Sequence, residues 1–261
     1  MTLTWKQARS LEELRAELDR RAEVQPRTRG TISSGIGPLD RVLPGEGYRR
    51  GTLVEWIAPQ GGSGATSLAW QVAPSVLREG ASLVVIDPEE EFYPPGLATL
   101  GIDPSRLLVV RFPTKRRDAP PRQGRRQRSR RSRDDPRESE VVWALEQTLR
   151  CPAVGMTLAS LESLESRSFR RLQLAAEQGG GVGVLLRGPT ATKAPSWAEV
   201  RLRVEPKPSQ GKVRRWRVEL LKCRGAAGMT WEWERDRETG VVSLATQLAP
   251  PASRSFAAGA S

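Results

Sequence analysis

The stretch from residue 52 to residue 87 constrains the fold of this chain more than any other part. An apolar run typical of a strand comes first, followed by a glycine-rich turn, a helical segment and a second apolar run. These four pieces are Thr52 to Ile57, Gly61 to Gly64, Thr66 to Leu77 and Leu83 to Ile86. Together they predict a βαβ unit, whose two strands are parallel. We therefore expect an α/β domain with a mostly parallel central sheet flanked by helices.

The glycine-rich turn partly matches a phosphate-binding loop. In such a loop, backbone N–H groups converge on an anion, a lysine reaches the β- and γ-phosphates, and a hydroxyl side chain holds magnesium. The pattern G-x-x-x-x-G-K-[ST] laid on PQGGSGAT puts Gly64 at the second glycine and Thr66 at the hydroxyl. The same alignment puts Pro59 at the first glycine and Ala65 at the lysine. The lysine is therefore missing.

The missing lysine bears on affinity and on chemistry. A charge pair near 4 Å is worth on the order of 4 kcal/mol at an intermediate dielectric constant, so its absence predicts weak binding of ATP and magnesium and no efficient hydrolysis. Two interpretations stay open. The loop is either a turn kept for its backbone geometry, or a weak nucleotide site completed by a basic side chain from elsewhere. We assign no firm cofactor and no metal site. The candidate nucleotide contacts are Gly61, Gly62, Ser63, Gly64, Ala65 and Thr66.

Composition removes several classes of active site. The 261 residues include no histidine, which excludes histidine-based triads and histidine metal ligands. The two cysteines, Cys151 and Cys223, are too few for a disulfide framework or a four-ligand zinc site. The first twenty residues carry charge every few positions and predict neither a secretory signal nor a membrane span. We expect a cytoplasmic protein without a membrane partner.

Most of the net charge of +12 lies in one segment. Residues 115–133 hold ten basic residues against the single acid Asp118, a net charge of +9 that leaves +3 for the rest of the chain. Prolines flank this segment, so we expect a disordered basic insertion over residues 113–138. Such a tract can neutralise phosphates without sequence preference, although a solvated loop has the same composition. The candidate nucleic-acid contacts are Arg116, Arg117, Arg125, Arg126, Arg128, Arg130, Arg131 and Arg133.

An amphipathic helix is predicted near residues 6–24. Ser10 and Glu13 form a capping box, and leucines follow at helical spacing. The narrow apolar stripe suits docking either on the same chain or on a neighbouring subunit of a homo-oligomer. The expected organisation is an N-terminal helix with a linker at 1–28, a core at 29–248 and a disordered tail at 249–261.

Two later elements carry side chains of functional interest. A helix near residues 161–178 has arginines on one side, and a run of glycines ends it. Those arginines suit contact with DNA or an acidic partner, although an ordinary exposed face is the more typical case. Trp231 and Trp233 alternate with glutamates in the first strand of a predicted hairpin. Two such residues on one strand face suit base stacking, but they are more often core residues.

Several segments resemble the core of the RecA recombinases. ISSG followed by LDRVLPGEGYRRGTLVEW looks like the family's entry into its phosphate loop, and VVIDPEEEF looks like the strand that carries its catalytic glutamate. The resemblance covers about residues 30 to 246 and implies a RecA-like single domain behind the N-terminal helix. It places Glu89 at the water-activating glutamate. It also places Lys222 and Arg224 at two lysines that reach the nucleotide of an adjacent subunit.

Departures from that pattern indicate a subgroup. Where the family has a strand ending in a magnesium-binding aspartate, residues 151–161 read CPAVGMTLASL and contain no acid. The segments RSFRRLQLAAE and VGVLLRGPTATKAPSWAEVRLRV look like the ImuA family of degenerate RecA homologues. That resemblance implies a damage-inducible accessory factor of the SOS type for mutagenic translesion DNA synthesis and DNA repair. The partners it implies are an ImuB-like polymerase-related protein, an error-prone replicative-type polymerase and, in addition, DNA.

The function predicted from these residues is binding. A lone carboxylate at Glu89, without the lysine, the aspartate or any histidine, does not make an enzyme. The leading hypothesis is a non-hydrolytic RecA-like adaptor. The alternative is a DNA-dependent ATPase or recombinase-like enzyme whose missing cation is Lys222 or Arg224 of a neighbouring subunit. The second alternative is a RecA-like inhibitor of cell division.

Overall fold

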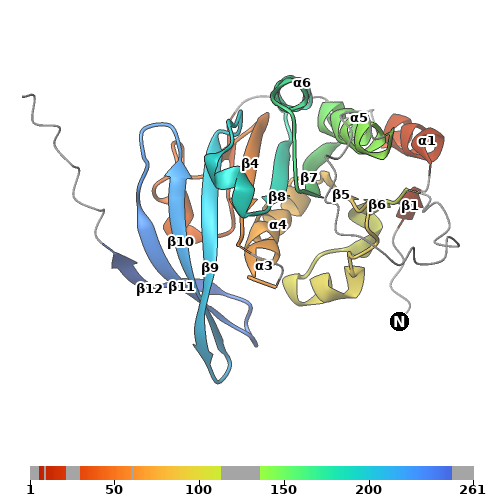
Figure 1. Ribbon diagram of the computed structural model, residues 1–261. Coiled ribbons are helices and arrows are strands. Elements are labelled where there is room, and N and C mark those ends of the chain that lie inside the picture. Colours follow the sequence, from red (N-terminus) through yellow and green to blue (C-terminus); the bar gives the residue numbers. More distant parts are fainter. Residues whose placement is uncertain (1–5, 9, 22–29, 60–61, 113–135, 249–261) are drawn as a thin grey trace, which may run out of the picture.

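The computed structural model describes residues 6–8, 10–21, 30–59, 62–112 and 136–248, and the main elements of this part form an α/β fold (Figure 1). The strands of its large sheet are β1 (Lys6–Ala8), β4 (Thr52–Ile57), β5 (Ser82–Ile86), β6 (Leu107–Val110), β7 (Val154–Leu161), β8 (Val182–Arg187), β9 (Val200–Gln210), β10 (Val213–Lys222), β11 (Thr230–Asp236) and β12 (Val242–Leu248). A small second sheet pairs β2 (Thr31–Ile32) with β3 (Tyr48–Arg49).

The large sheet has the order β1-β6-β5-β7-β8-β4-β9-β10-β11-β12. Neighbours from β1 to β9 in that order are parallel, and the pairs from β9 to β12 are antiparallel. Every residue of the parallel strands β4 and β5 is buried, and most are apolar, because both of their faces are covered. The expectation of a mostly parallel sheet flanked by helices is confirmed, and the fold fits a RecA-like domain.

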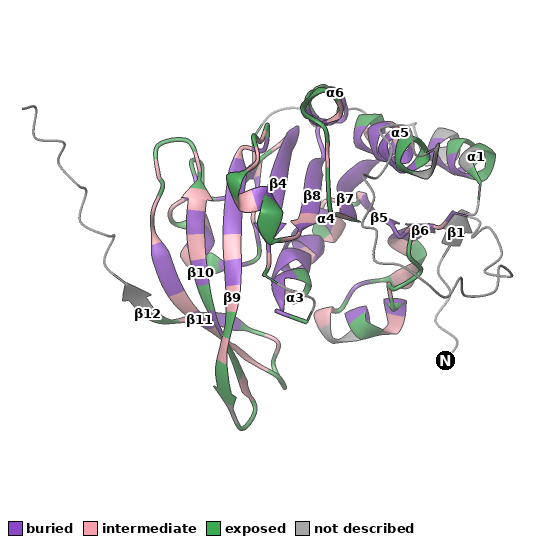
Figure 2. Ribbon diagram, viewed as in Figure 1, coloured by how far each residue is buried: buried purple, intermediate pink, exposed green. Residues whose placement is uncertain are grey.

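Two apolar layers enclose the parallel strands. The helices α1 (Leu11–Arg21), α5 (Pro136–Arg150) and α6 (Ser166–Gly179) lie along one face, and their layer includes Leu14, Leu145 and Phe169 (Figures 1 and 2). The opposite face is covered by α3 (Ala65–Ala69) and α4 (Ala73–Arg78). The shorter helical segments are α2 (Gly37–Asp40), η1 (Trp70–Val72), η2 (Pro94–Leu100), η3 (Pro104–Arg106) and η4 (Pro189–Lys193).

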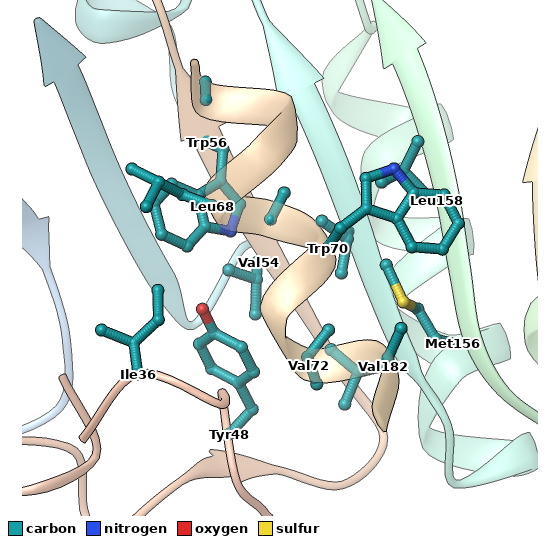
Figure 3. Close-up of a cluster of buried hydrophobic side chains, with 14 of the residues drawn as sticks. Ile36, Tyr48, Val54, Trp56, Leu68, Trp70, Val72, Met156, Leu158 and Val182 are labelled. Carbon is teal, nitrogen blue, oxygen red and sulfur yellow. The ribbon is translucent and has the colours of Figure 1, made fainter. Parts of the chain in front are cut away.

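The crossover helix predicted over residues 66–77 is interrupted. It consists of α3, the 3-10 turn η1 and α4, with Pro74 in the first turn of α4. Proline has no N–H group and clashes with the preceding turn of an α-helix, so a helix restarts there and does not run through. Figure 3 shows the apolar side chains that this segment and β4 bury, among them Trp56, Leu68 and Trp70. The βαβ unit is present as predicted, with a break inside its crossover.

The N-terminal segment differs from the single helix predicted over residues 6–24. Lys6–Ala8 is a strand that pairs in parallel with β6, and α1 begins only at Leu11. The capping contact is present, since the N–H of Glu13 donates to Ser10 Oγ at 3.1 Å. Leu14 is fully buried in the layer that contains α5. Of the two docking alternatives, the structure shows the helix on its own chain.

Parts of the predicted organisation lie outside the described residues. These parts are residues 22–28 of the linker, residues 113–135 with all eight candidate arginines, and the tail at 249–261. The predicted insertion extends three residues too far, because α5 begins at Pro136. No helix within the described residues is both long enough and apolar enough to cross a membrane.

The C-terminal hairpin was predicted correctly. β11 and β12 are antiparallel, and the Asp236 carboxylate accepts the N–H groups of Glu238 and Thr239 at 2.7 and 2.9 Å in the connecting turn. Trp231 and Trp233 are buried and their rings stack with centroids 5.7 Å apart. They are core residues, and base stacking by this pair is not available.

Candidate functional site

The loop between β4 and α3 has the backbone of a tight glycine turn. Gly62 and Gly64 have φ angles of +74° and +92°, a conformation that favours glycine. Gly64 directly precedes α3, and its carbonyl accepts the N–H of Leu68 at 3.1 Å. Thr66 is exposed, whereas Ser63 and Gly64 are buried. The loop therefore keeps a hydroxyl side chain at the surface in the first turn of the helix. Gly61 lies outside the described residues.

Trp216 of β10 packs directly on this loop. Its indole Nε1 donates to the carbonyl of Ser63 at 2.8 Å, and its side chain is buried. A Cβ atom at residue 64 would lie 2.2 Å from that nitrogen. A glycine is therefore needed here both because the indole leaves no space for a side chain and because φ is positive. The sequence did not reveal this residue. The alternation in RWRVELL places Trp216 on the buried face of a strand, but it does not say which segment 153 residues away the ring meets.

Ala65, at the position of the missing lysine, is 4% exposed and belongs to the apolar layer under α3. Within the described part of the chain, Trp216 is the residue whose side chain bonds to the loop, and no lysine or arginine makes a hydrogen bond to residues 62–66. The described contacts thus supply a rigid backbone and a hydroxyl group, without a cation at this position.

The ISSG segment is held against the crossover. Asp40 accepts the hydroxyl of Ser33 at 2.6 Å and the N–H of Ser34 at 2.8 Å. A Cβ at Gly35, where φ is +76°, would lie 1.9 Å from the carbonyl oxygen of Gln71. This close approach places the segment before β3 against η1, so the two parts that resemble RecA pack as one unit.

The acidic turn after β5 is fixed by its first residue. Asp87 accepts the N–H groups of Glu91 and Phe92 at 3.0 and 3.3 Å and pairs with Arg111 Nε at 3.1 Å. Phe92 in turn stacks on Trp70 with ring centroids 5.6 Å apart. Glu89 is exposed within this turn. It lies at the carboxyl edge of the parallel sheet, the edge at which β4 enters the glycine loop.

Strand β7 lies between β5 and β8, and its C-terminal end reaches the same edge. Its last residues, Ser160 and Leu161, carry no carboxylate, as the sequence indicated. The exposed Glu162 follows directly, one residue beyond the interval considered for a magnesium ligand. Sequence reasoning therefore missed an acid at this edge.

Lys222 and Arg224 lie far from the loop of their own chain. Lys222 is six residues beyond Trp216 along β10, which at strand spacing is roughly 20 Å. Both cations are exposed, and Lys222 Nζ donates to the carbonyl of Ser196 at 3.1 Å. Within a single chain, these two cations therefore do not reach the glycine turn.

The arginines predicted on the helix near residues 161–178 have different surroundings on α6. Arg170 lies over the ring of Trp197 at 4.8 Å, and Arg171 pairs with the buried carboxylate of Glu146, which also contacts Arg150. Phe169 is buried on the opposite side, and Gly180 ends the helix with φ +79°.

Comparisons with known proteins agree with this geometry. No protein-family model matches the chain. It is 28% identical over 221 residues to the protein ImuA of Caulobacter vibrioides (strain NA1000 / CB15N), an alignment that covers 77% of this chain and 81% of that protein. The chain is similar to ImuA over most of its length, and its fold is RecA-like.

Shorter matches link the ImuA-like chain to recombinases. It is 36% identical over 78 residues to the protein RecA of Rhodopirellula baltica, which covers 30% of this chain and 20% of that protein. It is 38% identical over 79 residues to the protein RecA of Malacoplasma penetrans, which covers 30% and 24%. The resemblance inferred from the sequence is therefore confirmed both for ImuA and for RecA.

Proposed function

We propose that this chain is a RecA-like accessory protein of error-prone translesion DNA synthesis that acts by binding and does not hydrolyse ATP. Similarity to ImuA over 77% of the chain supports a role in DNA-damage-induced mutagenesis. Within that role, the proposed task is that of an adaptor for an ImuB-like polymerase-related protein and an error-prone replicative-type polymerase. The observation that carries the non-hydrolytic part is Ala65, buried at the lysine position of a loop that keeps its glycines.

The physical reason lies in the charge that a triphosphate brings. Catalysis of phosphoryl transfer depends on positioning and on cations that stabilise the charge of the transition state. The loop offers backbone N–H groups and the hydroxyl of Thr66, and its side-chain contact is the neutral indole of Trp216. Such a loop suits a structural role in the scaffold, with ATP and magnesium bound weakly at most.

A hydrolytic enzyme with a cation supplied in trans is the competing proposal, and one observation favours it. Lys222 and Arg224 are exposed and lie roughly 20 Å or more along β10 from Trp216, near the opposite edge of the sheet. In a head-to-tail assembly such an edge faces the next subunit. This proposal requires ATP turnover that depends on assembly and on Glu89.

ATP hydrolysis by the intact chain, with and without single-stranded DNA, separates the two proposals. The adaptor proposal predicts no turnover above background in either condition. DNA-stimulated turnover that is lost in both Glu89→Gln and the double variant Lys222→Ala/Arg224→Ala would establish the enzyme instead. Turnover that survives in Glu89→Gln points to a contaminant.

The adaptor role itself is tested in cells. Deletion of the gene should lower the frequency of damage-induced mutations, and both the wild-type chain and Glu89→Gln should restore it equally. Failure of Glu89→Gln, with normal protein levels, would contradict a non-hydrolytic role. Co-purification of the chain with the ImuB-like protein provides the direct measurement of partner binding.

A further inference from the structure

A groove lies between α6 and the end of β10. Its walls come from α6, from Arg49 of β3, from residues 197–199 before β9 and from residues 222–224 at the end of β10, and its volume is about 270 Å³. We call it the α6–β10 groove. Four basic and two acidic side chains line it, so its lining carries a charge of +2. It lies at the edge of the sheet away from the glycine turn.

The acidic side chains of the groove already have partners. Glu199 accepts Arg49 Nε at 2.7 Å, and Glu177 accepts the amide of Gln173 at 3.1 Å. Among the described residues, Lys222 bonds only to a backbone carbonyl, and Arg224 makes no ion pair or side-chain hydrogen bond. Two exposed cations of the groove are thus left without a carboxylate, which makes them available to an anion.

The groove also exposes an aromatic ring. Trp197 is 45% exposed, although five of the chain's eight tryptophans are buried in the core. Its edge is fixed by a hydrogen bond from Nε1 to Ser166 Oγ at 3.4 Å, and Arg170 lies 4.8 Å from the ring centre. A ring held in place at the surface and accompanied by a guanidinium group is suited to stacking against a second flat group.

Gln173 adds an unsatisfied polar atom beside the groove. This lining residue is 5% exposed, and its Nε2 donates to the carbonyl of Gly51 at 3.3 Å and to Glu177. Both partners are acceptors, so the orientation of the amide is determined. Its Oε1 is buried without a hydrogen-bond partner in the described part of the chain. A buried acceptor of this kind is costly unless a donor reaches it.

We propose that the α6–β10 groove binds single-stranded DNA, with a base stacked at Trp197 and backbone phosphates at Lys222 and Arg224. A nucleic-acid strand offers both groups that the groove lacks: an anion for the two cations and a flat ring for Trp197. An acidic peptide would pair with the cations, but its carboxylates would not stack on the exposed indole of Trp197. The proposal deepens the proposed function and rests on it for the choice of DNA as the polyanion.

The test measures binding of a fluorescein-labelled oligothymidine to the intact chain by anisotropy over a series of salt concentrations. Stacking on an aromatic residue contributes about 1–3 kcal/mol per base, so Trp197→Ala should weaken binding about tenfold, and Trp197→Phe should keep most of the affinity. Lys222→Gln/Arg224→Gln should reduce the slope of log K against log salt by about 1.4, at about 0.7 per phosphate contact on a single strand.

Matched controls separate the groove from general charge. Arg214→Gln/Arg217→Gln removes two exposed cations from the same strand outside the groove and should leave the slope unchanged. The proposal would be overturned if this control variant reduced the slope as much as Lys222→Gln/Arg224→Gln does. It would also be overturned if folded Trp197→Ala bound the oligonucleotide as tightly as the wild type. Displacement of the oligonucleotide by equal concentrations of poly-glutamate or of free ATP would also overturn it, in favour of an acidic peptide or a mononucleotide. These outcomes leave the ATPase and mutagenesis assays unaffected, so the two proposals fail separately.

Discussion

The indole of Trp216 and the backbone of Ser63 are joined by a hydrogen bond of 2.8 Å that connects the antiparallel part of the sheet to the glycine loop. The ring occupies the space in which a Cβ of residue 64 would lie. A loop fixed in this way holds its shape without a bound phosphate. This explains how the geometry of a phosphate loop persists in a chain that has Ala65 at the lysine position.

Gly64→Ala should destabilise the fold by about 2–4 kcal/mol. Roughly 1–2 kcal/mol comes from a left-handed conformation at a residue with a Cβ, and the rest from overlap with Trp216. Urea unfolding provides the measurement. Gly62→Ala is the matched control, because Gly62 has φ +74° but open space around its Cβ, so about 1 kcal/mol is expected. Equal losses in the two variants would show that the ring contact is unimportant.

Trp216→Phe should loosen the loop locally. The substitution removes the donor to Ser63 and should raise amide hydrogen exchange over residues 63–68, with a loss of about 1 kcal/mol beyond the lost packing. Trp233→Phe is the control, since Trp233 is equally buried but its Nε1 has no partner in the described residues. Slow exchange in the loop of Trp216→Phe would contradict the assigned role of the indole.

Glu55→Ala should cost about 3–5 kcal/mol, because it leaves two buried arginines without their carboxylate. Glu55 is 1% exposed and accepts Arg187 at 2.9 Å and Arg201 at 2.6 Å. Burial lowers the pKa of the Arg187 guanidinium, and Glu55 opposes that shift. Thermal unfolding of the variant should occur well below that of the wild type. The half-exposed Glu205, 3.5 Å from Arg203, is the control, and Glu205→Ala should change stability by less than about 0.5 kcal/mol.

Leu14→Ala should lower the free energy of unfolding by about 2–5 kcal/mol, because Leu14 is fully buried against its own chain. Light scattering on the same sample reports the assembled mass, which should not change. A fall in mass with no loss of stability would mean that α1 docks on a neighbouring subunit in solution.

The sequence predicted the elements whose signals are local. The run Thr52–Ile57 is buried on both faces and became β4 with the predicted bounds, and the Asp236 turn produced the expected hairpin. Lys6–Ala8 could not be recognised as a strand, because its three residues show no apolar alternation and it forms by pairing with β6. The break at Pro74 was visible in the sequence, but a helix was expected to run through it.

The candidate site was predictable only in part, for a related reason. The glycines and the missing lysine are consecutive residues, so the alignment alone located them. Trp216 reaches the loop from another strand, and the α6–β10 groove joins Arg170, Trp197 and Lys222 from three separate segments. Pairings of this kind depend on strand order and register, which no local pattern specifies.

The most direct test of the central claim is calorimetric titration of the intact chain with ATP and magnesium. We expect no saturable binding to the wild-type chain, because the loop lacks the cation that would hold the β- and γ-phosphates. Tight, magnesium-dependent binding to the wild-type chain that is lost in Thr66→Ala would contradict this expectation.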